Sequence, residues 1–109
     1  MGPEAKVDAR VMDYAADQGW FSLKLTSLGM YGVAGIPDRL YLRLGYAFFM
    51  EMKKPGGLST PLQLERQQQL RNMGFNVYVV DDLIVGKRVI DKETEICERR
   101  KLRPRRHGT

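Results

Sequence analysis

The sequence predicts a single α/β domain in which helices pack on a mixed β-sheet. One segment near the N-terminus has apolar residues at helical spacing, and another after residue 60 has the start and stop signals of a helix. Four other segments alternate like strands or are rich in β-prone residues. At 109 residues, the chain is long enough for one such domain with one modest core.

The first helix is expected at about residues 4–18. Its apolar side chains recur at helical spacing at Val7, Val11 and Ala15. Gly19 follows where a glycine in the left-handed conformation commonly ends a helix.

A strand is expected next, in the stretch WFSLKL. Its residues alternate between two faces, with Phe21, Leu23 and Leu25 on one face and Trp20, Ser22 and Lys24 on the other. We expect Lys24 to lie on a face that borders a functional site, and Trp20 to pack in the core or share that border. The following TSLGMYGVAG has three glycines and no sustained period, so it is expected to be a loop.

Two further strands, DRLYLRL and AFFMEMK, are expected to form an antiparallel hairpin around Gly45. Counting by twos along the second strand places Glu51 and Lys53 on the same face. Asp38 begins the first strand, so the hairpin would bring Asp38 and Glu51 side by side.

A second helix is expected from Pro61, with Thr60 as its N-cap and Gly74 at its C-terminal end. The stretch FNVYVV after it is almost wholly apolar or β-prone, which predicts an interior strand buried on both faces. A last helix is expected between Leu83 and Ile96, although Gly86 interrupts it.

The net charge is concentrated at the C-terminal end. Residues 97–109 hold six of the 18 basic residues and one of the 13 acidic residues, so this segment carries all of the net charge of +5. A clustered basic segment attracts phosphate backbones without reading sequence. A solubilising tail is the alternative interpretation.

Composition excludes several other classes of protein. A hydrophobic fraction of 43% and a charged fraction of 28% are typical of a globular chain rather than a disordered one. No apolar run approaches the ~20 residues of a membrane span, and the N-terminus lacks the pattern of a signal peptide. The single cysteine, Cys97, excludes an intramolecular disulfide. We therefore expect an intracellular protein with no membrane partner.

Asp38 and Glu51 are the candidate metal ligands. Paired carboxylates repel each other unless a cation or a proton joins them, and Mg²⁺ typically binds one or two protein carboxylates together with phosphate oxygens. Lys53, on the face of Glu51, would then lie near a scissile phosphate, where it would orient a water or offset developing charge. Taken singly, each piece has a structural explanation: Pro-Asp marks turns, and Glu-x-Lys is common on solvated strands. The two motifs in this order, with a glycine-rich loop before them and a glycine-rich turn and a Gln-bearing helix after them, are much rarer together than either motif is alone.

The stretches GIPDRLYL and FFMEMKKPGGLSTPLQLERQQQLRNMGFNVYVVDD resemble the VRR-NUC domain, the virus-type replication-repair nuclease branch of the PD-(D/E)xK superfamily. The resemblance covers roughly residues 4–91. It implies a restriction-endonuclease-like core, a mixed β-sheet flanked by helices, over residues 1–96, followed by a basic tail over residues 97–109. It also implies a DNA phosphodiesterase that depends on Mg²⁺ or Mn²⁺.

The same resemblance implies the roles of individual residues. Asp38 and Glu51 correspond to the metal-binding acids, the Met52 carbonyl to a further ligand, and Lys53 to the catalytic lysine. Gln63 matches the active-site glutamine of the family, although a Thr-x-x-Gln capping box from Thr60 also explains it. Glu4 matches the acid of the first helix, which a helix N-terminus favours in any case. Gln67, Gln68 and Gln69 are interpreted as a polar helix face.

DNA contacts are expected from Lys54 and from the basic tail. The tail residues concerned are Arg99, Arg100, Lys101, Arg103, Arg105 and Arg106. The short chain agrees with a stand-alone unit, and stand-alone members resemble homodimeric enzymes that resolve Holliday (four-way) junctions in phage replication or repair. We therefore expect a structure-selective DNA endonuclease in a phage-infected or prophage-bearing cell. The alternatives are a DNA-binding module without catalysis and a protein-interaction subunit with a vestigial nuclease fold.

Overall fold

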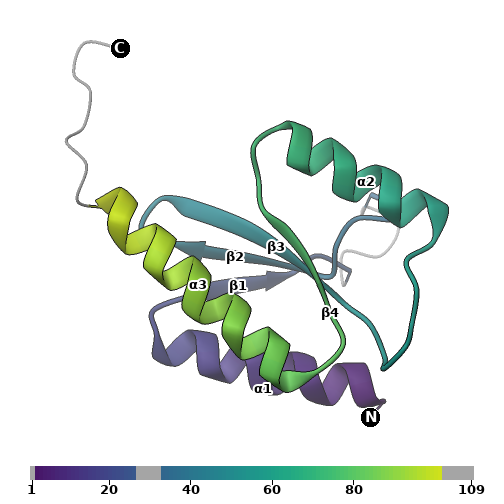
Figure 1. The fold of residues 1–109 in the computed structure, drawn as a ribbon, viewed down its shortest axis with the longest axis horizontal. Helices are drawn as coiled ribbons and strands as arrows, with labels where there is room; N and C mark the ends of the chain where they lie inside the picture. Colours follow the sequence, from purple (N-terminus) through teal and green to yellow (C-terminus); the bar gives the residue numbers. More distant parts are fainter. Residues whose placement is uncertain (1, 27–32, 102–109) are drawn as a thin grey trace.

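The computed structural model describes residues 2–26 and 33–101, and within them the predicted α/β fold with a mixed sheet is confirmed (Figure 1). Its elements in chain order are α1 (Pro3–Asp17), β1 (Phe21–Lys24), β2 (Arg39–Arg43), β3 (Tyr46–Met52), α2 (Pro61–Asn72), β4 (Val77–Val80) and α3 (Leu83–Lys101). None of these helices is both long and apolar enough to span a bilayer.

The four strands lie in the order β1-β2-β3-β4. The first three are antiparallel neighbours, and β4 runs parallel to β3. Figure 1 shows α1 and α3 side by side, while α2 lies apart from them. Side-chain contacts place α1 and α3 on the face that carries Arg39 and Tyr46, and α2 on the face that carries Lys53.

The core lies between the sheet and the pair α1 and α3. Trp20, Tyr41 and Phe48 form an aromatic cluster, in which Tyr41 stacks on Phe48 at 5.0 Å between ring centroids and Trp20 meets Phe48 edge-on at 4.9 Å. Trp20 also donates a hydrogen bond from Nε1 to Thr94 Oγ1 at 2.9 Å. Its indole therefore anchors α3 to the sheet.

Strand β4 differs from the prediction of an interior strand. It pairs with β3 alone among the described residues, so it is an edge strand, and the side chain of Val79 is 42% exposed. An edge strand needs only one buried face, and the apolar run of residues 75–80 cannot by itself distinguish the two cases.

Helix α3 is longer than predicted because two interactions hold its last turns. Cys97 is buried, and Glu98 accepts a hydrogen bond from Arg43 Nη2 at 2.6 Å. The first residues of the expected basic tail, 97–101, are therefore helical.

Gly86 is tolerated within α3 because the helix packs closely on α1. A Cβ atom at this position would lie 2.4 Å from Val11 Cγ2.

Candidate active site

The structure brings Asp38 and Glu51 to the same end of the sheet. Asp38 directly precedes β2, and Glu51 lies near the end of β3, which is antiparallel to β2. The Met52 backbone N–H donates to Asp38 Oδ2 at 2.5 Å, which fixes the carboxylate of Asp38 beside the end of β3. The hairpin geometry expected from the spacing of these two acids is therefore present.

Lys53, directly after β3, and Gln63, in the first turn of α2, join this cluster. Lys53 Nζ lies 3.1 Å from Glu51 Oε2 and donates to Gln63 Oε1 at 2.6 Å. The same Gln63 oxygen accepts from the Thr60 backbone N–H at 2.8 Å, and Thr60 Oγ1 accepts from the Gln63 N–H. The capping box and the contact with the lysine thus coexist, and the start of α2 positions the ammonium group of Lys53.

A pocket of about 290 Å³ opens beside Asp38. Glu4 and Asp8 from α1, Lys24 and Met52 contribute to its lining, so Lys24 borders the site as expected. Two carboxylate oxygens, Glu4 Oε2 and Glu51 Oε1, are buried without a hydrogen-bond partner in the described structure. Buried polar atoms are normally satisfied, so these two oxygens require an explanation.

The environment disfavours the charged forms of both acids. Burial raises the pKa of Asp38 above its ordinary value, against the opposing effect of the Met52 N–H. Burial also raises the pKa of Glu51, and the charge of Asp38 adds to this effect while Lys53 opposes it. A cation near the two carboxylates would relieve both effects.

The donor set suits a hard divalent cation. Asp38 and Glu51, with the Met52 carbonyl and with Glu4 nearby, offer oxygen ligands only, and the unpartnered Glu51 oxygen is available to such an ion. Within residues 2–26 and 33–101, no group of three acidic, histidine or cysteine side chains is gathered as a ready-made metal site. Two carboxylates are nevertheless as many as Mg²⁺ usually takes from a protein.

An ion pair that was not predicted supports the site. Arg39 donates from Nε and Nη2 to the two oxygens of Asp8 at 2.9 and 2.8 Å, and Arg39 Nη1 donates to Ser22 Oγ at 3.1 Å. Asp8 lies one helical turn after Glu4 and Arg39 directly follows Asp38, but no pattern in the sequence indicates that these two side chains meet.

Gln67 was expected on a polar helix face, and this prediction is wrong. Its side chain is buried and donates to Ser59 Oγ at 3.1 Å. It also favours the charged form of Glu51 and so opposes the raised pKa of that acid. Gln68 and Gln69 are exposed as expected.

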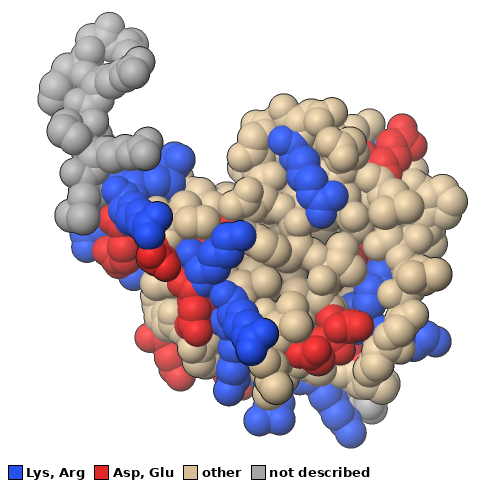
Figure 2. Space-filling view, in the orientation of Figure 1, with Lys and Arg blue, Asp and Glu red and all other residues tan. Residues whose placement is uncertain are grey.

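The expected DNA-contacting residues lie in two places. Lys54 is exposed and directly follows Lys53. The helical residues Arg99, Arg100 and Lys101 lie toward the opposite end of β2, since Arg100 is 5.1 Å from the Tyr46 ring centroid and Tyr46 pairs with Arg43. Figure 2 shows Lys and Arg side chains along α3 with acidic side chains between them, and Arg99 and Lys101 pair with Glu95 and Glu98. Arg103, Arg105 and Arg106 are outside the described residues.

The fold is similar to that of a solved structure described as "VRR_NUC domain". The TM-score is 0.72 at 27% sequence identity, over 84% of this chain and 97% of that chain. No family model matches the sequence, and no curated protein matches it. The resemblance to the VRR-NUC domain and the α/β fold class that it implied are confirmed.

Proposed function

We propose that this chain, which has the fold of the VRR-NUC nuclease domain, is a divalent-metal-dependent DNA endonuclease that hydrolyses phosphodiester bonds. The observation that carries the proposal is the buried, unpartnered Glu51 oxygen beside Asp38 and Lys53. Leaving a buried polar atom unsatisfied costs about 1–3 kcal/mol, and the cost is larger for a charged group such as a carboxylate. A bound cation would remove this cost.

Each residue of the site has a role in this proposal. Asp38, Glu51 and the Met52 carbonyl would hold Mg²⁺ or Mn²⁺, with Glu4 as a weaker ligand. When bound, the ion would polarise a phosphoryl oxygen of the substrate. Lys53, fixed by Gln63, would place its ammonium group against the charge that develops on the phosphorane-like transition state.

The proposed substrate is branched DNA, with a four-way junction as the leading candidate, cut by a homodimer as in phage replication or repair. Cations at both ends of the sheet, Lys54 at one and Arg99 to Lys101 at the other, support contact with more than one segment of DNA. Phe21 is 62% exposed and Leu23 is 43% exposed on β1, which supports a second copy covering this part of the sheet.

A cleavage assay tests the proposal. A labelled four-way junction, a matched linear duplex and a single strand are incubated with Mg²⁺, with Mn²⁺ and with EDTA. Lys53→Ala is expected to lower the cleavage rate about 10²–10⁴-fold while it leaves DNA binding intact. Lys87→Ala is the matched control, because it removes one lysine from the other face of the domain, beside Tyr14.

The outcomes separate the candidate functions. Metal-dependent cutting that is lost in Lys53→Ala supports the nuclease, and preference for the junction over the duplex supports the branched substrate. Binding without cutting under either metal would refute the enzyme and favour the non-catalytic DNA-binding module. Sedimentation of the wild-type chain checks the homodimer independently.

A further inference from the structure

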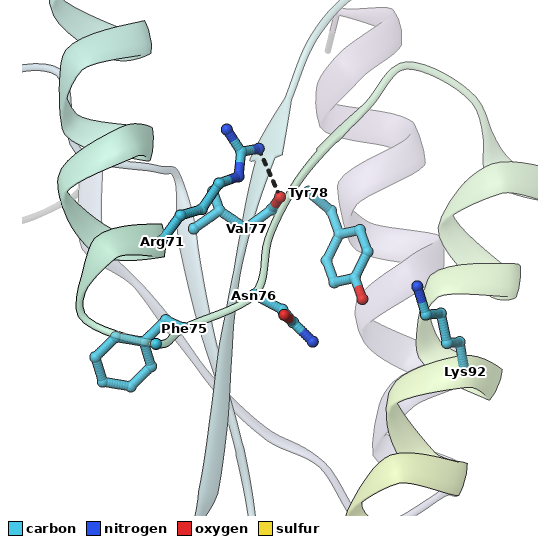
Figure 3. A pocket seen from close by; sticks show the side chains of 7 residues that line it. Arg71, Phe75, Asn76, Val77, Tyr78 and Lys92 are labelled. Carbon is cyan, nitrogen blue, oxygen red and sulfur yellow. Dashed lines mark hydrogen bonds between the residues drawn. The ribbon is translucent and has the colours of Figure 1, made fainter.

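A second pocket lies at the other end of β4 from the active site (Figure 3). Its volume is about 380 Å³, and its walls come from the C-terminal end of α2, the start of β4 and the middle of α3. Val77 at this end pairs with Phe49, whereas Val80 at the far end pairs with Met52 in the active site. The two pockets therefore open at different ends of the same pair of strands.

Two cations approach this pocket from different helices. Arg71 on α2 donates from Nη2 to the Val77 carbonyl oxygen at 2.8 Å, which fixes the guanidinium and leaves further N–H groups for a ligand. Lys92 Nζ on α3 lies 5.6 Å from the centroid of the Tyr78 ring. Figure 3 shows Arg71 and Lys92 on opposite sides of Tyr78. No acidic side chain is among the described residues that line the pocket.

The floor of the pocket is fixed by a buried carboxylate beneath it. Glu93 is fully buried and accepts hydrogen bonds from Tyr46 Oη at 2.5 Å, Tyr78 Oη at 2.5 Å and Asn76 Nδ2 at 2.7 Å. Burial and Glu93 raise the pKa of Tyr78, which keeps its hydroxyl protonated as a donor to this carboxylate. The negative charge is thus enclosed by donors, and the positions of Asn76 and Tyr78 are set before any ligand arrives.

An aromatic ring stands at the rim. Phe75 is 37% exposed, and it packs edge-on against Phe49 with 5.4 Å between ring centroids. A held, partly exposed ring beside cations is the combination that proteins use for unpaired nucleotides, in which the base stacks and the phosphate pairs with Lys or Arg. The volume also lies within the usual range of small-molecule sites, about 300–1,000 Å³.

We infer that this pocket is a second DNA contact, in which Arg71 and Lys92 hold the phosphate of one nucleotide and Phe75 receives its base. The inference rests on the proposed nuclease function and deepens it, since the contact would position a strand away from the scissile phosphate. It assigns the pocket to strand binding and not to chemistry.

Nuclear magnetic resonance tests the pocket without any cleavage. ¹⁵N-labelled protein in EDTA is titrated with thymidine 5′-monophosphate, with thymidine and with inorganic phosphate. The monophosphate is expected to shift the amide signals of residues 75–78 and Lys92, with phosphate weaker and thymidine weaker still. Shifts confined to the Asp38 pocket, or equal affinity for all three probes, would overturn the inference.

Substitutions then test the two cations. Arg71→Ala combined with Lys92→Ala is expected to weaken monophosphate binding at least about 10-fold, because two charge-assisted contacts are lost. The control pair Arg10→Ala and Lys87→Ala removes the same charge from α1 and the α1 side of α3. If the first pair fails to fold, Lys92→Glu serves alone, because Lys92 is exposed and its substitution leaves the core intact. Equal weakening by both pairs would refute the site.

Binding of a labelled single strand in EDTA, measured at several salt concentrations, connects the pocket to DNA. The substitutions Arg71→Ala and Lys92→Ala together are expected to reduce the slope of log affinity against log salt by about 1–2. The control pair is expected to leave this slope nearly unchanged. Junction cleavage with no response of the pocket would refute this inference and leave the nuclease standing. A responsive pocket with no cleavage under any metal would refute the nuclease and leave a DNA-binding pocket.

Discussion

Replacing Asp8 by Asn should destabilise the domain strongly, because it removes the counter-charge of a buried guanidinium. The side chains of Arg39 and Asp8 are only 8% and 14% exposed, and two hydrogen bonds of 2.9 and 2.8 Å join them. Removing one partner of a buried pair costs about 3–5 kcal/mol. Since Asp8 keeps some exposure, we expect a loss of about 3 kcal/mol in the free energy of unfolding.

The control for this loss in the free energy of unfolding is Glu98→Gln, which breaks a more exposed ion pair. That substitution breaks the pair of Arg43 and Glu98, in which Glu98 is 42% exposed, so it should cost much less than Asp8→Asn, because solvent screens an exposed pair. Urea unfolding followed by circular dichroism measures both variants. A third variant, Asp8→Leu with Arg39→Met, removes both charges and should recover most of the stability lost in Asp8→Asn. If Asp8→Asn cost no more than Glu98→Gln, the burial argument would fail.

Three further predictions follow from single contacts. Burial raises the pKa of Glu51 above its ordinary 4.5, so the folded state binds more protons between that value and the raised one. The free energy of unfolding in EDTA should therefore fall as the pH rises through this window, and Glu51→Gln should reduce this dependence, leaving the part that comes from the raised pKa of Asp38. Gly86→Ala should cost about 1–3 kcal/mol in urea unfolding, since its Cβ would lie 2.4 Å from Val11 Cγ2, and Val11→Ala should partly rescue it. Tyr78→Phe should cost about 1.5–3 kcal/mol by removing a donor to the buried Glu93 carboxylate, and a change below about 0.5 kcal/mol would contradict the network.

Much of the fold could be predicted because local signals and tertiary structure agree. The N-cap at Thr60 and the turn at Gly45, which has φ of 76°, are decided by residues adjacent in the sequence. The edge position of β4 could not be predicted in the same way, because it depends on whether any other strand pairs with it. Gly86 was misleading for a related reason: it weakens a helix locally, but its small size lets α3 approach Val11.

In the candidate site, too, contacts within one hairpin could be predicted from the sequence, whereas contacts between separate elements could not. Asp38 and Glu51 could be brought together from sequence because one hairpin connects them. The pair of Asp8 and Arg39 spans helix and sheet, and no local pattern encodes it. The buried Gln67 is another such case, since a polar residue in a polar helix predicts exposure until the packing of α2 over Glu51 is known.

The two pockets together predict where along a DNA strand charge should matter. From Val77 to Val80, β4 advances three residues, or about 10 Å at ~3.3 Å per residue. The second contact should therefore fall on a linkage other than the one that is cut.

Single neutral methylphosphonate linkages, placed one at a time along a cleaved strand, test this spacing. At the linkage held by the second pocket, binding should weaken for the wild type and stay nearly unchanged for the Arg71→Ala and Lys92→Ala pair, because that variant has already lost both cations. At all other linkages the two proteins should respond alike. If the Arg71→Ala and Lys92→Ala pair responded like the wild type at every linkage, the second pocket would have no role in holding the strand, even if it binds free nucleotides.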